Sequence, residues 1–236
     1  MSNIVGNEIK FIRLNNNDLI GRCMDKGFFE GHIIEAAANL LQNKPAGVIL
    51  DIGANMGSFT VPLAYYNPAL QFVCFEPQRQ VYYQLCGNIA LNGLRNVIAH
   101  NFGLDTTDRF IDIEVPDYAT ENNIGAFSLD AEVREHDDYL CKSKGGMERI
   151  QLLQLDGMGL TNISLIKLDV EGMELNVLKG GLKTLETNNY PPIVFESWNH
   201  KDWFLPRRQE LITFLESNGY TITPMGEDNI AIHGGR

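Results

Sequence analysis

The sequence has few of the features that mark secreted, membrane-bound or metal-binding proteins. Its 4 cysteines, Cys23, Cys74, Cys86 and Cys141, form no C-x-x-C pair, which fits neither a zinc site nor a disulfide framework. The sequence has no run of about 18 apolar residues and no basic N-terminal region followed by an apolar stretch. We therefore expect reduced thiols, no membrane association and a cytoplasmic protein.

Positive charge is also scarce in this chain. The 19 Lys and Arg residues stand against 30 Asp and Glu residues, which gives a formal net charge of −11 without any Lys/Arg cluster. Because neutralising phosphates supplies most of the non-specific affinity for nucleic acids, we expect no nucleic-acid partner. The acidic balance does not identify a substrate, since many ordinary cytosolic proteins share it. The sequence also leaves the oligomeric state open.

The composition is that of an ordinary globular protein. The chain has 236 residues, of which 44% are hydrophobic and 21% are charged, and this length suits one α/β domain. Residues 1–46 predict a preface of extended and helical pieces. Residues 47–236 predict the main domain, with an insertion at about 109–155 where short β-like pieces surround a polar segment.

From residue 47 onward, short apolar runs alternate with segments of helical periodicity. After a first strand that begins at residue 47, further strands are predicted at 71–75, 97–101, 165–170 and 193–196. They are apolar enough to be buried on both faces, as the strands of a parallel sheet are, so the pattern predicts a doubly wound α/β sheet. The two final strands are separated by a turn, which predicts a hairpin and an antiparallel last strand.

A glycine turn follows the first strand in Asp51-Ile-Gly-Ala-Asn-Met-Gly57. Glycines at the carboxyl end of a strand let the backbone pass close to a ligand, which favours a nucleoside cofactor. The spacing from Gly53 to Gly57 is not the G-x-G-x-x-G of dinucleotide sites, so a ligand without a pyrophosphate is favoured. Glu76 ends the second strand, where a carboxylate can accept both ribose hydroxyls.

Four motifs resemble the FkbM family of methyltransferases. They are Asp51-Ile-Gly-Ala-Asn-x-Gly, Phe75-Glu-Pro, residues 88–97 ending in Asn-x-Leu-x-Asn-Val, and Leu165-Ile-Lys-Leu-Asp-Val-Glu-Gly-Met-Glu. The resemblance covers roughly residues 28–222 and implies a class I, Rossmann-like methyltransferase that uses S-adenosylmethionine. It further implies O-methylation of a hydroxyl on a small molecule such as a sugar or natural product.

Two segments depart from the usual form of the family. Gly103-Leu-Asp stands where Ala-Leu-Ser-Asp is typical, and Gly125-Ala-Phe-Ser-Leu has Phe127 in place of a serine. Both departures weaken inference about the substrate side.

The cofactor residues are assigned along these motifs. Asp51, Gly53 and Asn55 are expected around the methionine end, with Gly57 completing the turn. Glu76 is expected to bind the ribose. The amide of Asn101 is placed to meet the adenine edge, although Asn at a strand end is also a frequent turn residue.

Acids at the ends of two later strands are the candidates for proton transfer. Asp169 and Glu171 follow a continuous apolar strand, and Glu196 closes the next one, four residues before His200. The alternatives are that Glu171 only begins a helix, and that His200 lies in a solvated loop. We predict no metal, and we expect Lys167 to have a structural role, because an unpaired buried ammonium is costly.

Two other classes of protein remain as alternatives. A nicotinamide-dependent oxidoreductase would need the pyrophosphate glycine pattern that is missing here. A non-catalytic S-adenosylmethionine-binding protein would keep the cofactor residues and tolerate neutral replacements of the acids.

Overall fold

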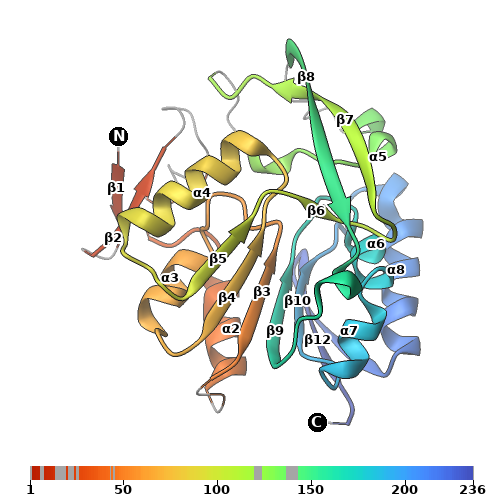
Figure 1. The fold of residues 1–236 in the computed structure, drawn as a ribbon. Helices are drawn as coiled ribbons and strands as arrows, with labels where there is room; N and C mark the ends of the chain where they lie inside the picture. The colour runs from red at the N-terminus through yellow and green to blue at the C-terminus, as the bar shows by residue number, and fades with distance from the viewer. Residues whose placement is uncertain are drawn as a thin grey trace.

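A seven-stranded sheet forms the centre of the molecule (Figure 1). The computed structural model describes residues 2–5, 8–13, 20, 24, 27–42, 44, 46–119, 124–136 and 143–235. The strand order is β11-β12-β10-β9-β3-β4-β5. In chain order these strands are β3 (Val48–Ile52), β4 (Gln71–Phe75), β5 (Val97–His100), β9 (Ile163–Leu168), β10 (Ile193–Glu196), β11 (Tyr220–Met225) and β12 (Asp228–His233).

The strand directions confirm the topology predicted from the sequence. Strands β3, β4, β5, β9 and β10 pair in parallel, whereas β12 pairs antiparallel with both β10 and β11. The last strand therefore runs against an otherwise parallel sheet. The carboxyl ends of the parallel strands lie at one edge of the sheet, where open α/β folds bind their ligands.

Helices cover both faces of the sheet. One face packs against α2 (Gly31–Leu41), α3 (Thr60–Tyr66) and α4 (Arg79–Leu91), and the other against α6 (Glu174–Lys179), α7 (Leu182–Thr187) and α8 (Leu205–Ser217). Successive strand residues point to opposite faces, so Ile49 enters the first core while Leu50 and Ile52 enter the second. This two-sided burial explains why the strands are continuous apolar runs.

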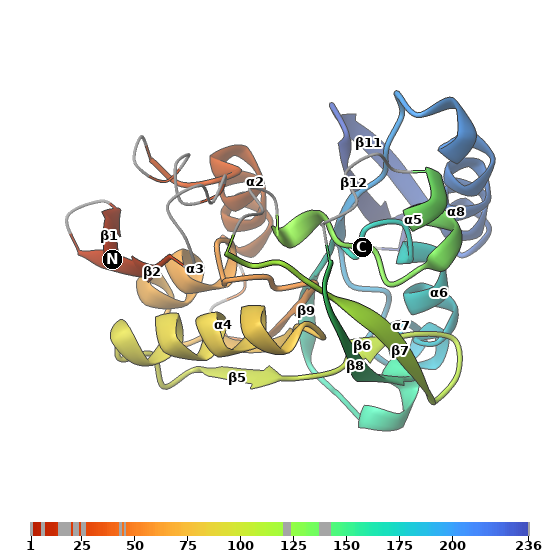
Figure 2. The same ribbon diagram turned by 90° about the horizontal axis from the view of Figure 1, so that it is seen from above.

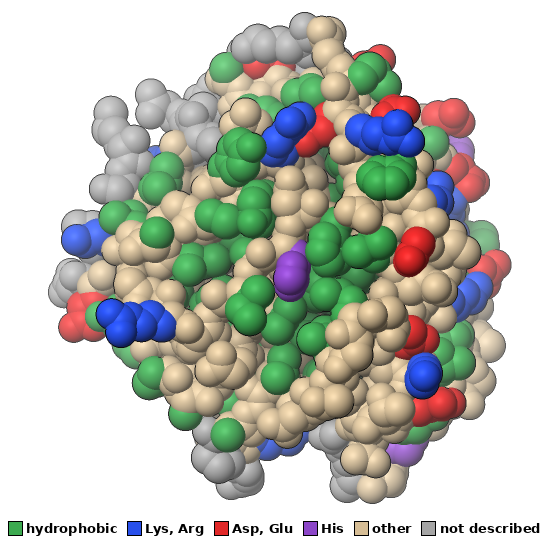
Figure 3. All heavy atoms as spheres, in the orientation of Figure 1, with side chains coloured by type: hydrophobic (Ala, Val, Ile, Leu, Met, Phe, Trp, Pro, Cys, Tyr) green, Lys and Arg blue, Asp and Glu red, His purple; other side chains and the backbone are tan. Residues whose placement is uncertain are grey.

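The face beside α7 is less completely covered near the edge strand β5. Ile98 is 56% exposed there, and the His100 ring stacks on Phe75 with its centroid 5.4 Å away. Figure 3 shows a broad group of hydrophobic side chains on this side of the molecule, with a histidine among them and charged side chains mostly nearer the rim.

The segment predicted as an insertion forms a small second sheet. Its strands are β6 (Gly103–Leu104), β7 (Arg109–Pro116) and β8 (Ser143–Leu153), and β7 pairs antiparallel with β8. Short helices η1 (Ile124–Ala126), α5 (Ala131–His136) and η2 (Leu155–Met158) accompany it. Ile113, Ile150 and Leu152 bury one face of this sheet, which places η1 and the residues after it over the carboxyl edge of the main sheet.

The N-terminal strands β1 (Ser2–Val5) and β2 (Ile9–Ile12) form an antiparallel pair beside α3 and α4 (Figure 2). Asn88 of α4 and Asn92, the residue after α4, hold β2 through its backbone. Asn88 accepts from the N–H of Ile12 at 2.7 Å, and Asn92 accepts from the N–H of Lys10 at 2.8 Å. Asn88 and Asn92 belong to the motif at residues 88–97, so this motif helps to hold the N-terminal strands against the main domain.

The described residues allow only a partial comparison with the expectations about cysteines and membrane helices. Cys74 and Cys86 are free thiols, whereas Cys23 and Cys141 lie outside the described residues. None of the described helices has the length and apolar character required to cross a bilayer.

Candidate active site

The glycine turn after β3 lies directly against the end of β9. Gly53 has a φ of 83°, and a Cβ built there would lie 1.7 Å from the carbonyl oxygen of Asp169. Gly57, with a φ of 88°, packs so that a Cβ would lie 2.8 Å from a Leu85 methyl group. Only glycine combines this left-handed backbone with such close approach, which explains both positions of the predicted turn.

A cavity opens beside this turn. Gly53, Asn55 and Glu76 line its polar side together with Asp169 and Glu171. Its apolar side is lined by Leu104, Phe127, Leu129 and Met173. A cavity with one apolar end and one end of convergent polar groups suits a nucleoside whose base is buried and whose sugar and tail are polar.

Glu76 follows β4 and lines the cavity. Its side chain accepts from the N–H of Asn55 at 3.0 Å and from the N–H of Gln78 at 2.8 Å. Burial raises the pKa of Glu76 to about 7, against the lowering effect of these two hydrogen bonds. The carboxyl group is thus fixed at the cavity wall by backbone donors.

Two other predicted cofactor residues lie behind the cavity wall. Asp51 is fully buried, and its Oδ2 accepts from the Thr60 hydroxyl at 2.6 Å. The Asn101 amide donates to the backbone carbonyls of Glu76 and Pro77 at 2.9 and 3.0 Å. Neither side chain is part of the cavity lining, so in this structure both support the loops that carry the lining residues.

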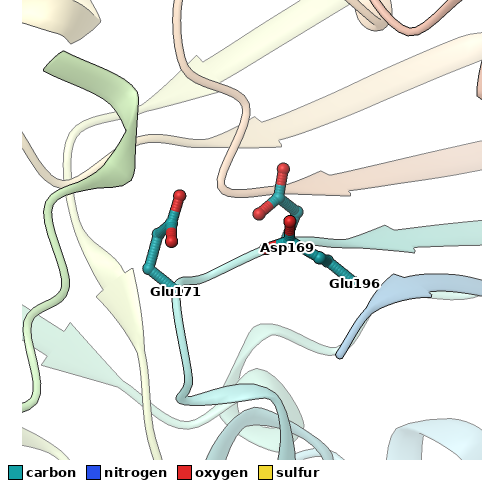
Figure 4. Close-up of side chains that lie close together, drawn as sticks. All are labelled: Asp169, Glu171 and Glu196. Carbon is teal, nitrogen blue, oxygen red and sulfur yellow. The ribbon is translucent and has the colours of Figure 1, made fainter. Parts of the chain in front are cut away.

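Three acids converge at the carboxyl edge of β9 and β10. Each of Asp169, Glu171 and Glu196 offers an oxygen, and the three oxygens lie within 4.8 Å of one another (Figure 4). Burial, and then the charge of Asp169, raises the pKa of Glu196 to about 11 and that of Glu171 well above its usual range. Carboxylates at this spacing could hold a divalent cation or share protons.

Glu171 and Glu174 have separate roles in the structure. Glu174 is buried at the start of α6, and its Oε1 accepts from the N–H groups of Val170 and Gly172 at 3.1 and 3.2 Å. Glu171 precedes the helix with a φ of 53°, an uncommon conformation outside glycine, and its side chain joins the acid group. Glu174 therefore performs the helix-start role that was the alternative for Glu171.

His200 lies apart from the three acids. Its side chain is 52% exposed, and Nδ1 lies 2.7 Å from Oε1 of Glu227. The neighbouring Trp198 is buried instead, and its indole N–H donates to Glu196 at 3.1 Å. The structure thus joins Trp198 to the acid group and leaves His200 on the surface loop.

Sequence reasoning missed Glu30 and Asp228 near the acid group and gave Lys167 only a structural role. Glu30 precedes α2 with a φ of 50°, and burial followed by the charge of Asp169 raises its pKa to about 7. Asp228 on β12 pairs with His32 at 3.0 Å. Lys167 donates to Asp169 at 2.9 Å and to the Gly53 carbonyl at 3.3 Å.

The family assignment follows from a comparison with known proteins. Residues 51–222, more than half of the chain, match the family model described as the methyltransferase FkbM domain. The chain therefore belongs to this family, which confirms the resemblance predicted from the four motifs.

Related proteins carry methyltransferase names. The chain is 28% identical over 226 residues to methyltransferase sdnD of Sordaria araneosa, covering 84% of this chain and 81% of the relative. It is 28% identical over 159 residues to 2-O-methyltransferase NoeI of Sinorhizobium fredii, covering 64% of this chain and 63% of that relative.

Solved structures agree on the fold. One is a Staphylococcus aureus protein assigned as a caffeoyl-CoA O-methyltransferase, with a TM-score of 0.53 and 11% identity over 87% of this chain and 85% of that one. Another is precorrin-6y C5,15-methyltransferase of Geobacter metallireducens, with a TM-score of 0.50 and 14% identity over 89% of this chain and 92% of that one. The predicted class I methyltransferase fold is confirmed.

Proposed function

We propose that this protein is an S-adenosylmethionine-dependent O-methyltransferase that acts on a hydroxyl of a small molecule, such as a sugar or another natural product. The observation that carries the proposal is one cavity that brings the glycine turn and Glu76 together with Asp169 and Glu171. The turn and Glu76 suit a nucleoside cofactor, and the two acids suit a hydroxyl acceptor next to it.

The cavity fits the proposed cofactor. Glu76 would accept the ribose hydroxyls, the backbone around Gly53 and Asn55 would hold the methionine end, and Leu104 and Phe127 would enclose the base. Gly53 leaves no room for a side chain against Asp169, so the backbone itself forms that part of the wall. When bound there, S-adenosylmethionine would supply a methyl group on a sulfonium centre.

The acids act on the acceptor. Asp169 and Glu171 line the cavity, so both are placed to orient the acceptor hydroxyl, and Asp169 is placed to take its proton as the new bond forms. Glu196 contacts the same group of oxygens from β10 and helps to set its protonation. Gly125 of η1 and the neighbouring Phe127 line the same cavity and would help to exclude water around the reacting atoms.

Three further observations support a small hydroxyl acceptor. One relative is named a 2-O-methyltransferase. The net charge of −11 disfavours a nucleic-acid substrate, and after β9 the chain has Asp169-Val-Glu-Gly where base-directed amino methyltransferases usually have an Asn/Asp-Pro-Pro motif.

The first test is thermal unfolding with S-adenosylmethionine, S-adenosylhomocysteine and NAD in parallel. A ligand at about 100 times its dissociation constant stabilises the folded state by about 2.7 kcal/mol. At roughly 2–4 °C per kcal/mol for a chain of this size, we expect a rise of several degrees with both sulfur nucleosides. Such a rise would justify a screen of hydroxyl acceptors, whereas a response to NAD alone would favour the oxidoreductase alternative.

A further inference from the structure

Lys167 is a buried cation between the residues proposed to hold the cofactor and the residues proposed to hold the methyl acceptor. It lies near the end of β9, two positions before Asp169, and is only 7% exposed. An ammonium group is retained at such depth only where opposite charges and hydrogen-bond acceptors surround it. The groups that surround the Lys167 ammonium therefore indicate its role in the site.

On the cofactor side, Lys167 contacts the glycine turn. Its Nζ donates to the carbonyl oxygen of Gly53 at 3.3 Å and lies 3.9 Å from Oδ1 of Asp51. The Thr60 hydroxyl fixes the other oxygen of Asp51, and Oδ1 is buried without a hydrogen bond. The ammonium ion is thus the counter-charge of a carboxylate that water does not reach.

On the acceptor side, the same ammonium group donates to Oδ2 of Asp169 at 2.9 Å. The backbone of Asp169 already meets the turn, because its N–H donates to Ile52 at 2.9 Å and its carbonyl oxygen lies against Gly53. Through its hydrogen bonds to Gly53 and Asp169, Lys167 also ties the Asp169 side chain to the glycine turn. Oδ2 of Asp169 is then fixed, and Oδ1 is left to bind the hydroxyl of the methyl acceptor.

The surroundings of Lys167 exclude a role as a proton acceptor. Burial lowers the pKa of Lys167, but the charges of Asp169, Asp51 and Glu30 outweigh this effect and hold it above its ordinary value. The amine therefore stays protonated at neutral pH and has no lone pair to take a proton from a hydroxyl.

We propose that Lys167 is a positioning residue whose ammonium group holds the cofactor-binding turn and the Asp169 carboxylate in one fixed arrangement. This inference rests on the proposed function, since it gives the turn to the methyl donor and Asp169 to the acceptor. Methyl transfer requires the acceptor oxygen to lie in line and roughly 3 Å from the methyl carbon. Lys167 fixes the spacing between the parts that hold the two reactants.

The test compares Lys167 with Lys44, a lysine from another segment that contacts the other end of β9. Lys44 donates to the carbonyl oxygen of Ser164 at 3.0 Å, so Lys44→Met also removes an ammonium-to-backbone hydrogen bond on β9. Affinity for S-adenosylhomocysteine is measured by titration calorimetry, and folding is checked by thermal unfolding. We expect Lys167→Met to weaken binding by about tenfold or more, Lys167→Arg to recover part of it, and Lys44→Met to stay within about twofold.

A double-mutant cycle with Asp169→Asn separates positioning from general destabilisation. If Lys167 links Asp169 to the turn, Asp169→Asn weakens binding several-fold, and the double variant binds within about twofold of Lys167→Met. Effects that multiply, or a Lys167→Met protein that binds like the wild type, would overturn the proposal. If Lys167→Met does not fold, the same cycle with Lys167→Arg decides. A wild-type protein that binds no S-adenosylhomocysteine would contradict the proposed function instead.

Discussion

The cofactor half and the acceptor half of the candidate active site hold their carboxyl groups in different ways. In the cofactor half, Glu76 accepts two backbone hydrogen bonds and Asp51 accepts one from a threonine hydroxyl. In the acceptor half, Glu171 and Glu196 face the charge of Asp169, and burial and that charge raise the pKa of each. Burial raises the pKa of the carboxyl groups in both halves, but hydrogen bonds oppose that rise in the first half, whereas the charge of Asp169 adds to it in the second.

This difference shows how one site can serve a fixed ligand and a variable one. Donors built into the turn and the β4 loop hold the Glu76 carboxyl in a single orientation before any ligand binds. Glu171 and Glu196 lie instead beside the charge of Asp169, which favours the protonated, neutral form of each. The predictions below test this contrast, beginning with the largest expected effect.

Gly53→Ala should abolish binding in the cofactor half. The new methyl group would lie 1.7 Å from the Asp169 carbonyl oxygen, so the turn or the strand end must move. We expect affinity for S-adenosylhomocysteine to fall by about a hundredfold or more, measured by calorimetry. Gly93→Ala is the matched control, because Gly93 also has a positive φ, 64°, but open space around it. Equal losses in both variants would show that backbone strain alone is responsible.

Glu171→Gln should separate the acceptor half from the cofactor half. With an acceptor from the screen, we expect product formation to fall by roughly 10²-fold, because the acceptor is no longer oriented correctly, while affinity for S-adenosylhomocysteine stays within about twofold. His200→Gln, at a half-exposed position, should change the rate by less than about threefold. Full activity in Glu171→Gln would remove this acid from the mechanism. A rate loss in His200→Gln would return the histidine to it.

Glu76→Gln should produce a smaller loss, confined to binding. The amide keeps one acceptor oxygen but loses the charge and the second acceptor that the ribose hydroxyls would use. We expect affinity for S-adenosylhomocysteine to fall on the order of tenfold. Glu148→Gln is the control, since Glu148 is also buried but pairs with Arg79 outside the cavity. Unchanged affinity in Glu76→Gln would place the ribose elsewhere.

The cofactor half could be predicted from the sequence because it is local. Asp51 to Gly57 form the end of β3 and the turn after it, and Glu76 directly follows the adjacent strand β4, so chain order alone places them together. Chain order does not, however, predict the direction in which a single side chain points. Asn101 ends up near the predicted place, but its amide turns to the backbone of the loop after β4 instead of the cavity.

The acceptor half could be predicted only in part because it is assembled from distant segments. Asp169 and Glu196 were visible as acids at strand ends, which the parallel sheet brings to one edge. Glu30 comes from the N-terminal segment and Asp228 from the last strand, and neither has a local motif. Lys167 was read as structural, because sequence does not show that its buried charge meets Asp169.

The smallest predicted effect concerns the pH dependence of stability in the acceptor half. A carboxyl group whose pKa is raised in the folded state binds its proton more tightly there than in the unfolded chain. Stability from Glu196, with a pKa of about 11 against an ordinary value of 4.5, is therefore fully present below pH 4.5 and is lost as pH rises toward 11.

Glu196→Gln removes this titration while keeping a polar side chain that can still accept from Trp198. The melting temperature of the variant relative to wild type should therefore rise between pH 6 and pH 9 by up to several degrees per pH unit, since one group contributes at most about 1.4 kcal/mol per pH unit. Glu135→Gln, at an exposed position on α5, should follow the wild-type curve. Parallel curves for wild type and Glu196→Gln would mean that the acceptor half holds no extra proton on Glu196. The contrast between the two halves would then rest on Glu171 alone.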